Sequence, residues 1–417
     1  MKPYDTYKDS GIEWIGAIPN HWDSIRLKFL GESIIGIIYS PDDVVNEGEG
    51  ILVLRSSNIQ EGKLAFEDNV FVNKSIQEKH LTKEGDILVC ARNGSAHLVG
   101  KSAFISKEYE RLTFGAFMSI VRSDLRKFLF YFFNSQIFKA QTGLFSTSTI
   151  NQLTSDTLNN MFISVPSEKK EQIAIATYLD HKTAEIDALI ADKKRLLELY
   201  EEEKTAIINQ AVTKGIDPKA KMKDSGIDWL GEIPERWELK RLRYVCKITT
   251  GSKDTENRED DGIYPFFVRS QTIERISTYS YDGEGILTAG DGVGVCKVWH
   301  YINGKFDFHQ RVYLMYDFVN IQGEFLFYFM RQNFIHDVLK QSAKSTVDSL
   351  RRNMFLDFVV AFPEDTKEQQ SIVVHIETEC TRIDAKIAKT QKLIKLLTEY
   401  RTTLISEVVT GKIKVMD

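Results

Sequence analysis

Two long stretches of the chain carry apolar residues at the spacing of a helix. Residues 166–214 and 363–410 contain no Pro or Gly after their first position, and Gly215 and Gly411 follow them as stop signals. Gaps of three, four and seven residues between apolar positions predict an amphipathic, coiled-coil helix in each stretch. The positions that are apolar in both are Ile175/Ile372, Leu179/Ile376, Ile186/Ile383, Ile190/Ile387, Leu196/Leu393, Leu197/Ile394, Tyr200/Leu397, Ile207/Leu404, Ile208/Ile405 and Ala211/Val408.

Each predicted helix needs a partner for its apolar stripe. At ~1.5 Å per residue, a helix of about 45 residues is roughly 65–70 Å long, which is more than a small domain covers. We expect the two helices to pack on each other as an antiparallel pair, with a globular part at or near each end. The alternative is that each helix packs only on its own globular part.

The helices belong to a longer repeat. Residues 8–22 read KDSGIEWIGAIPNHW, and residues 223–237 read KDSGIDWLGEIPERW, at an offset of 215. The segment Phe128–Phe132 recurs as Phe325–Phe329 at an offset of 197. The chain therefore consists of two copies of one unit. The copies agree at their ends and differ in their middles, which suggests a common frame and two different recognition surfaces.

The middles, 23–165 and 238–362, have a mixed α/β pattern. Strand-like runs are Ile51–Leu54, Asp86–Val89 and Phe266–Val268, and Lys127–Phe138 and Glu324–Leu339 are expected to be aromatic-rich helices. The predicted fold class is α+β, with two pseudo-two-fold-related α/β domains separated by a pair of long antiparallel helices. The expected segments are 1–165 (opening 1–22), helix 166–214, 215–362 (repeated opening 222–237) and helix 363–417.

Composition narrows the class of protein. Apolar residues make up 42% of the chain and charged residues 27%, as in ordinary globular proteins, and the net charge is −5. No apolar run has the length of a membrane span and no signal peptide is evident, so we expect a cytoplasmic protein. The four cysteines are scattered singly, which predicts reduced thiols, and the eight histidines show no metal-ligand spacing.

Catalytic signatures are absent from the sequence. The Asn-Pro-Pro-aromatic tetrapeptide of amino-methyltransferases does not occur. The segment Gly290–Lys297 is rich in glycine but lacks the Walker spacing, so a turn between strands explains it better. Acidic pairs such as Glu47/Glu49 lie in polar loops, and no Ser/His/Asp or Cys/His arrangement stands out. The sequence therefore favours a binding protein without a catalytic residue, metal or cofactor of its own.

The doubled opening, the Arg-Ser-x-x-Ile segment at Arg55, the Pro-x-x-x-Lys-Glu-Gln entry into each long helix and the shared Val-Thr exit together identify a resemblance. Over nearly its whole length, the chain resembles the specificity subunit of Type I restriction-modification enzymes. The resemblance implies two target-recognition domains that each read one half of a bipartite, asymmetric site in double-stranded DNA, held apart by the helices. It also implies two modification subunits, which use S-adenosylmethionine to methylate adenine at N6, and restriction subunits, which use ATP and Mg²⁺. The specificity subunit itself catalyses nothing.

Side chains that read major-groove edges gather in the divergent loops. The candidates for DNA binding are Arg55, Ser56, Ser57, Asn58, Arg92, Asn93, Ser95, Lys101, Ser148 and Thr149 in the first copy, and Arg269, Ser270, Gln271, Thr272, Lys297, Gln310, Arg311, Lys344, Ser345 and Thr346 in the second. The alternative for each is a plain surface or turn residue. Arg55/Arg269 and Ser56/Ser270 recur, which favours contacts to the DNA backbone. Asn58 against Thr272, and Arg92 with Asn93 against Asp291, are better candidates for distinguishing the half-sites.

The charge of the chain bears on its affinity for DNA. Because no excess of positive charge is present, we expect weak DNA binding by the isolated chain and a need for partner subunits that neutralise phosphates. Two rival interpretations remain: a tandem coiled-coil scaffold that binds no nucleic acid, and a nuclease or methyltransferase with an unrecognised site. The Trp-containing openings are expected to pack where a helix end meets a globular part, or to dock the modification subunits.

Overall fold

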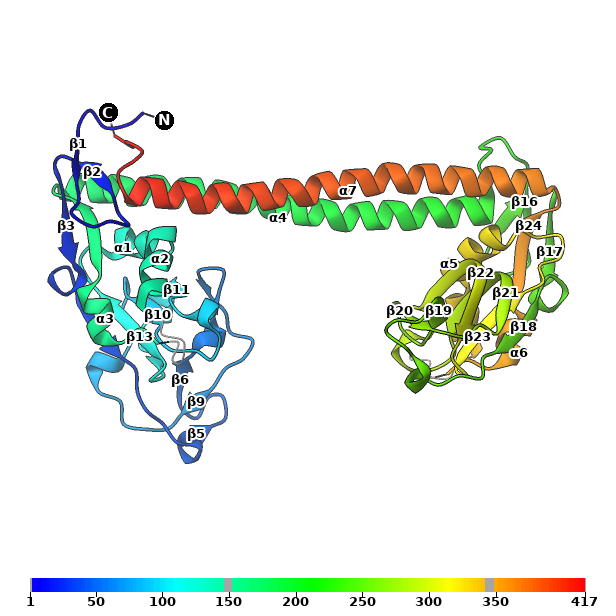
Figure 1. Cartoon of the computed structure of the whole chain (residues 1–417), viewed down its shortest axis with the longest axis horizontal. Coiled ribbons are helices and arrows are strands. Elements are labelled where there is room, and N and C mark those ends of the chain that lie inside the picture. The colour runs from blue at the N-terminus through cyan, green and yellow to red at the C-terminus, as the bar shows by residue number, and fades with distance from the viewer. Residues whose placement is uncertain (1, 146–151, 342–348, 417) are drawn as a thin grey trace. The chain divides into compact units, whose positions relative to one another are not determined.

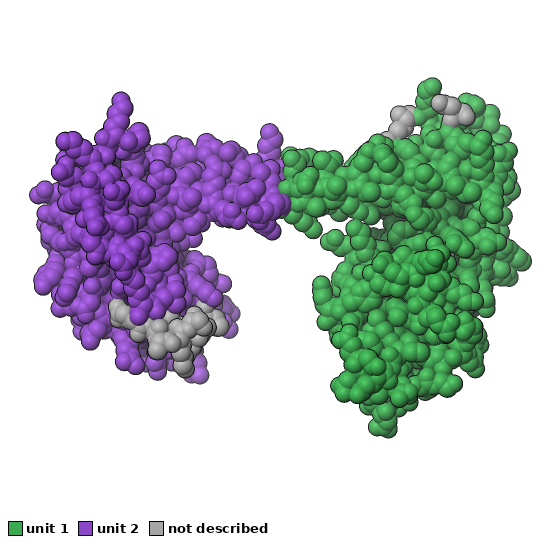
Figure 2. Space-filling view, turned by 180° about the vertical axis from the view of Figure 1, so that it is seen from behind, with its two compact units in different colours: residues 1–194, 392–417 green, residues 195–391 purple. Residues whose placement is uncertain are grey.

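The structure is a computed structural model that describes residues 2–145, 152–341 and 349–416. The chain divides into two compact units, coloured separately in Figure 2: unit 1 holds residues 1–194 and 392–417, and unit 2 holds residues 195–391. Among the described helices, none is long and apolar enough to cross a membrane.

The two longest helices are α4 (Lys169–Lys214) and α7 (Thr366–Val409), and each contributes to both units. In unit 1 the first turns of α4 share a buried cluster with the last turns of α7, for example Leu179 with Leu404. In unit 2 the end of α4 shares a cluster with the start of α7, for example Ile208 with Ile376. The beginning of each helix thus meets the end of the other. The predicted antiparallel pair is confirmed, and the alternative of separate helices is wrong.

Ion pairs along the polar flanks keep the register of α4 and α7. Within unit 1, Arg401 donates Nε and Nη2 to the carboxylate of Asp187 at 2.8 and 3.2 Å. Within unit 2, Lys204 Nζ lies 2.7 Å from an oxygen of Asp384. Arg401 and Asp187 are both partly buried, so this two-pronged pair is screened less by solvent than an exposed one.

The described residues of unit 1 form two four-stranded sheets, ordered β11-β10-β13-β4 and β12-β6-β9-β5, and the antiparallel pairs β1-β2, β14-β3 and β7-β8. Its strands are β1 (Tyr7–Asp9), β2 (Ala17–Pro19), β3 (Trp22–Arg26), β4 (Glu32–Ile35), β5 (Val44–Val45), β6 (Ile51–Leu54), β7 (Ile59–Gln60), β8 (Lys63–Leu64), β9 (Phe71–Val72), β10 (Ile87–Cys90), β11 (Ser102–Phe104), β12 (Thr113–Phe114), β13 (Met118–Arg122) and β14 (Phe162–Pro166). Its shorter helices are α1 (Arg126–Phe133), α2 (Gln136–Phe145) and α3 (Ser155–Asn160).

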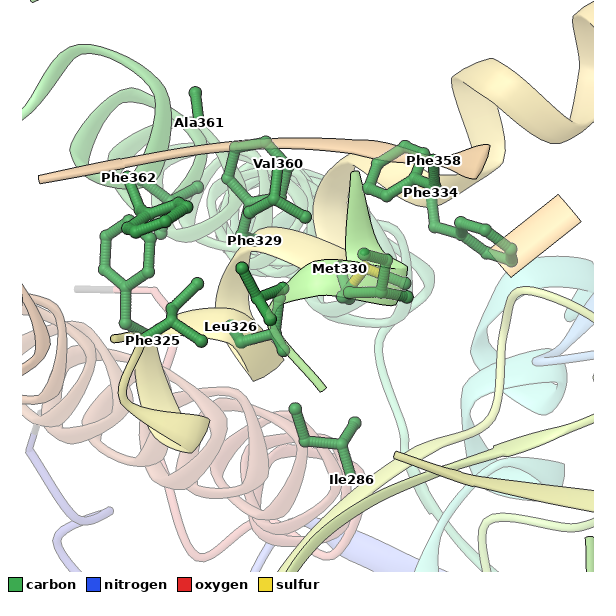
Figure 3. Packing of buried hydrophobic residues seen from close by; sticks show 14 of the residues in the cluster. Ile286, Phe325, Leu326, Phe329, Met330, Phe334, Phe358, Val360, Ala361 and Phe362 are labelled. Carbon is green, nitrogen blue, oxygen red and sulfur yellow. The ribbon is translucent and has the colours of Figure 1, made fainter. Parts of the chain in front are cut away.

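Unit 2, as far as the structure describes it, has one six-stranded sheet, ordered β18-β23-β21-β22-β19-β20, and the antiparallel pairs β15-β16 and β17-β24. Its strands are β15 (Met222–Asp224), β16 (Glu232–Pro234), β17 (Trp237–Arg241), β18 (Lys247–Thr250), β19 (Tyr264–Phe267), β20 (Ile273–Ile276), β21 (Tyr281–Ala289), β22 (Trp299–Phe308), β23 (Val312–Tyr316) and β24 (Val359–Pro363), with helices α5 (Gly323–Gln341) and α6 (Arg352–Asp357). In its core Phe329 and Phe334 of α5 pack beside Phe358, the residue directly before β24 (Figure 3). The expected strands and the α/β character of both middles are confirmed.

One predicted helix differs between the copies. Residues 127–138 were expected to form a single helix, but the structure has α1 and α2 with a break at Asn134 and Ser135. The Asn134 amide donates to the carbonyl of Phe130 at 2.9 Å, and the Ser135 hydroxyl donates to that of Phe132 at 2.6 Å. Such short polar side chains compete for helix carbonyls. The second copy has Arg331 and Gln332 at these positions, and α5 continues through them.

The doubled opening forms the same structure in both units. The indole N–H of Trp22 donates to Glu171 at 3.1 Å, and that of Trp237 donates to Glu368 at 2.9 Å. Both indoles are buried, and each ties a strand to the first turn of a long helix. The expected packing of these tryptophans at a helix end is confirmed, whereas Trp14 is 37% exposed.

The N-terminal segment closes onto the end of α7. The Tyr7 hydroxyl donates to the carbonyl of Gly411 at 3.2 Å, and the backbone N–H of Lys414 donates to the carbonyl of Lys2 at 2.9 Å. The marked termini are accordingly close together in Figure 1. Gly411 packs on Trp22 just as Gly215, at the end of α4, packs on Trp237. The gap between the termini is thus equivalent to the linker 215–221.

This equivalence predicts that the chain tolerates circular permutation. A permutant that joins residue 417 to residue 1 through a short Gly/Ser linker and opens within residues 216–221 should fold. It closes the gap between the termini and opens the equivalent linker between the two copies. We expect one soluble species whose thermal midpoint lies within about 3 °C of the parent, since a change of ~1 kcal/mol shifts the midpoint of a unit of about 200 residues by roughly that amount. A control opened between Leu287 and Thr288, in buried strand β21, should not fold. Aggregation of the first permutant would contradict the closed arrangement.

Candidate nucleic-acid interface

In unit 1, candidate residues meet where strands β6 and β10 end. We name residues 55–58, 91–95, 116–117 and 152–153 the first loop cluster. The Asn93 amide donates to the Ser56 hydroxyl at 3.0 Å, which joins two of these loops. Arg92 is exposed, and its guanidinium lies over the ring of Phe117, 5.2 Å from the centroid. The sequence-based candidates Ser56, Arg92 and Asn93 are therefore brought together.

Asn58 occupies a different environment from its neighbours in the first loop cluster. Its side chain is fully buried, at 0% exposure. Its amide oxygen accepts from the backbone N–H of Arg55 at 2.9 Å, and its amide nitrogen donates to the carbonyl of Ala65 at 2.9 Å and to Asn69 at 3.2 Å. Because both ends of the amide are occupied within the chain, the geometry favours a role for Asn58 in holding the loop.

The remaining candidates of the first copy differ in exposure. Arg55 is half-buried and pairs with Asp68 at 2.8 Å. Ser57 is half-buried, with a hydroxyl that meets no hydrogen-bond partner in the described part of the chain. Ser95 is exposed, while Lys101 stands at the far end of the same loop, with its backbone carbonyl accepting from Cys90.

Unit 2 has a corresponding second loop cluster, formed by residues 268–272, 290–297, 309–311 and 349–350. The carboxylate of Asp291 lies at its centre. It accepts from Arg269 at 3.0 Å and lies 3.6 Å from a guanidinium nitrogen of Arg311. Two candidate arginines are therefore oriented by Asp291, a residue that the sequence had singled out only for its difference from Arg92 and Asn93.

Other candidates of the second copy border this acid and its arginines. Gln310 donates to Asp254 at 2.7 Å, and Ser270 offers its carbonyl to Nε2 of His300 at 3.2 Å. Gln271, Thr272 and Lys297 are exposed. The candidates Ser148, Thr149, Lys344, Ser345 and Thr346 lie outside the described residues.

A buried histidine supports the turn that carries Arg311. Nδ1 of His309 accepts from the backbone N–H of Arg311 at 2.9 Å, so this nitrogen is unprotonated. Burial lowers the pKa of His309, Asp254 raises it and Arg269 lowers it. The lowered pKa keeps the imidazole neutral near pH 7, the state that this hydrogen bond requires.

Comparison with known protein families gives these loops a context. The family described as "Type I restriction modification DNA specificity domain" matches residues 19–199 and 234–397, which takes in most of each copy. The chain belongs to this family. The resemblance inferred from the doubled opening and the paired helices is confirmed.

Individual relatives of the type I specificity family match parts of the chain. The EcoDI specificity subunit of Escherichia coli is 27% identical over 44% of this chain and 40% of its own length. The EcoKI specificity subunit of Escherichia coli strain K12 is 24% identical over 56% of this chain and 50% of its own length. The putative MjaX specificity subunit of Methanocaldococcus jannaschii is 28% identical, covering 60% of each chain. The chain thus spans about half the length of the curated relatives it matches.

Solved structures share the fold. The HsdS subunit from Thermoanaerobacter tengcongensis has a TM-score of 0.55 at 14% identity and covers 95% of this chain and 98% of its own. A chain from a study of complex assembly and conformational transition of the type I R-M system has a TM-score of 0.66 at 15% identity, covering 95% of this chain and 99% of its own. Two α/β bodies with α4 and α7 packed together are therefore the fold of this type I specificity protein.

Strand pairing shows that Arg55 and Arg269, which the sequence aligned in the two type I specificity repeats, are not at equivalent positions. Leu54 pairs with Phe114 in unit 1, and Phe267 pairs with Phe308 in unit 2. These pairs are equivalent because the backbone N–H of the next residue, Gly115 or His309, donates to the carbonyl of Leu54 or Phe267. Leu54 and Phe267 are thus equivalent, at an offset of 213 residues. Arg55 and Arg269 are 214 residues apart, so they differ by one position in the strand register. The recurrence of Arg-Ser is a similarity of sequence that the register does not preserve.

Sequence reasoning missed several residues of the loop clusters. Phe117 is 59% exposed, although an isolated aromatic in a β-rich segment is normally assigned to the core. Arg351 and Arg352 follow Leu350 and are both exposed. Burial raises the pKa of Tyr313, and the charges of Arg352 and Arg311 lower it. The Arg351-Arg352 dipeptide at the start of the short helix α6 was the available signal. Among the described residues, no group of His, Cys, Asp or Glu has the arrangement of a metal site.

The environment of Asn58 predicts its effect on stability. Asn58→Ala should lower the free energy of unfolding by about 1–3 kcal/mol, because it leaves partly buried groups, the Arg55 N–H and the Ala65 carbonyl, without their partner. Urea titration measures this change. Ser95→Ala, an exposed control in the same cluster, should stay within about 0.5 kcal/mol of the parent. If Asn58→Ala were as stable as the parent, Asn58 would not be holding the loop, and it would again be a candidate for base contact.

Proposed function

We propose that this chain is the DNA specificity subunit of a type I restriction-modification complex. It binds a bipartite, asymmetric site in double-stranded DNA, with one half read by the domain at 1–165 and the other by the domain at 215–362. The helical segments 166–214 and 363–417 join them. One observation carries this proposal: two copies of one backbone frame present loop clusters whose polar side chains differ, in a chain of the DNA specificity family.

The readers use chemistry suited to base edges. Arginine matches the acceptors of guanine in the major groove, and Asn, Gln and Ser pair with other base edges. Arg92, Arg269, Arg311 and Lys297 are exposed and available to DNA. The recurring frame beneath them would fix the register of each reader on the duplex.

The partners follow from the same proposal. The chain would recruit two modification subunits, which supply S-adenosylmethionine chemistry at adenine N6, and restriction subunits, which use ATP and Mg²⁺. The similarity in fold to a chain from a study of type I R-M complex assembly supports this role. This chain would supply recognition only, with no cofactor or catalytic residue of its own.

The charge of the chain predicts how it binds alone. With a net charge of −5, the isolated chain should bind its site far more weakly than the complex with modification subunits, which would neutralise phosphates. Fluorescence anisotropy with one labelled duplex at physiological salt compares the two. Equal affinities would contradict this division of labour.

The decisive test is the pattern of DNA methylation. The chain is co-expressed with the modification subunit of its own system, and N6-methyladenine is mapped across the host genome. We expect one motif of two unlike halves with a fixed gap. Arg92→Ala should relax one position of the half read by the first copy and leave the other half unchanged, because the two loop clusters are separate.

The controls of this experiment separate the alternatives. Cells with the modification subunit alone should show no gapped motif. If stable chain is made and no gapped motif arises with it, the tandem coiled-coil scaffold without DNA binding becomes the better interpretation. Methylation or cleavage by the purified chain alone would instead favour an enzyme with an unrecognised site.

A further inference from the structure

Backbone hydrogen bonds make four positions equivalent in the two loop clusters. The N–H groups of Ala91 and Gly290 donate to the carbonyls of Phe117 and Arg311 at 2.9 and 2.8 Å. The carbonyls of Ala91 and Gly290 accept from the N–H groups of Leu153 and Leu350, both at 2.7 Å. The same junction is therefore built twice. It places Arg92 and Asp291 at one equivalent position, and Phe117 and Arg311 at another.

The side chains at these equivalent positions differ in chemical class. In the first cluster a cation, Arg92, covers one face of an exposed aromatic ring, Phe117. In the second cluster an anion, Asp291, pairs with an exposed cation, Arg311. Asp291 is only 22% exposed and also holds Arg269. The frame is constant, while the group that it presents to solvent changes from apolar to cationic.

This change matches a difference in base chemistry. An apolar side chain in the major groove contacts the C5-methyl group of thymine, whereas an arginine donates two hydrogen bonds to O6 and N7 of guanine. A carboxylate that holds a guanidinium reduces the freedom lost on binding. Arg92 over Phe117 similarly restrains the ring through a cation–π contact.

We propose that position 117/311 is the same base-reading position in the two half-sites, where Phe117 selects a T·A pair and Arg311 selects guanine. Arg92 and Asp291 are positioning residues for these two readers. This inference rests on the proposed function. It adds that the two half-sites carry different bases, a T·A pair and a guanine, at the position contacted by residue 117 or 311.

The first test changes the reader of the second copy. Methyladenine is mapped for the complex of modification subunits with Arg311→Gln, since a glutamine pairs with adenine instead of guanine. We expect one position of the second half-site to change from guanine to adenine, with the original sequence bound roughly 5- to 150-fold more weakly. Asp291→Asn should relax that same position, and any further change should stay within the second half-site, because Asp291 also holds Arg269. Arg236→Gln, an exposed control in the turn between β16 and β17, should leave the motif unchanged.

The second test places the residue types of the second copy at the equivalent positions of the first copy. The double variant Arg92→Asp with Phe117→Arg installs the second copy's pair in the first, and should replace the T·A pair by guanine at one position of the first half-site. If this variant does not fold, the single substitution Phe117→Gln is measured, for which adenine is expected at that position. Thermal unfolding reports folding independently of base choice.

The outcomes separate the inference from the proposed function. A gapped motif for the parent that stays unchanged in Arg311→Gln and in the folded Phe117 variant would overturn the inference and leave the proposed function standing. A change in both halves at once would also overturn it, because each position should affect one half only. Absence of any gapped motif for the parent would overturn the proposed function itself.

Discussion

The burial of two long apolar stripes is the constraint on which the rest of the structure depends. A stripe along more than forty residues exceeds what a small α/β body can cover, so each helix needs another helix. Because α4 and α7 come from two copies of one unit, an antiparallel pairing lets both bury equivalent positions near their ends, such as Leu179 and Ile376. In the middle of the stripe burial is incomplete, and Leu393 is 40% exposed. The beginning of each helix then also packs on its own copy, through Trp22 with Glu171 and Trp237 with Glu368. The N-terminal opening consequently packs on the end of α7, although the whole chain separates them.

Such a frame frees the loop clusters to diverge. The junction of Ala91 with Leu153, repeated as Gly290 with Leu350, consists of backbone hydrogen bonds, which place no demand on side-chain type. The same junction therefore carries Arg92 and Phe117 in one copy and Asp291 and Arg311 in the other, although the sheets around it differ. A duplicated reader of two unlike sequences needs this separation, because phosphate and frame contacts set register while side chains on base edges set specificity.

The sequence predicted the helices, the duplication and the family because these depend on local periodicity and repeated motifs, and α4 ends at the residue predicted, Lys214. It failed where competition between local and distant interactions decides the outcome. Asn134 and Ser135 interrupt a helix that apolar spacing alone would continue. The alignment of Arg55 with Arg269 was wrong because it followed sequence similarity. Pairing of the preceding strands with β12 and β22 sets a register in which these two arginines differ by one position. Asn58 is buried although the sequence made it a candidate for base contact, and Phe117 is exposed although nothing in the sequence singled it out. Both environments depend on how the loops fold, which local sequence patterns do not predict.

The near-neutral charge has a structural counterpart in the loop clusters. Arg55 is paired with Asp68, and Arg269 and Arg311 share Asp291. Acids that hold arginines in place lower the long-range attraction for DNA but fix the direction in which each guanidinium points. In a reader built this way, side-chain charge contributes to discrimination between bases more than to overall affinity. In the proposed function, the remaining affinity comes from partner subunits that neutralise phosphates.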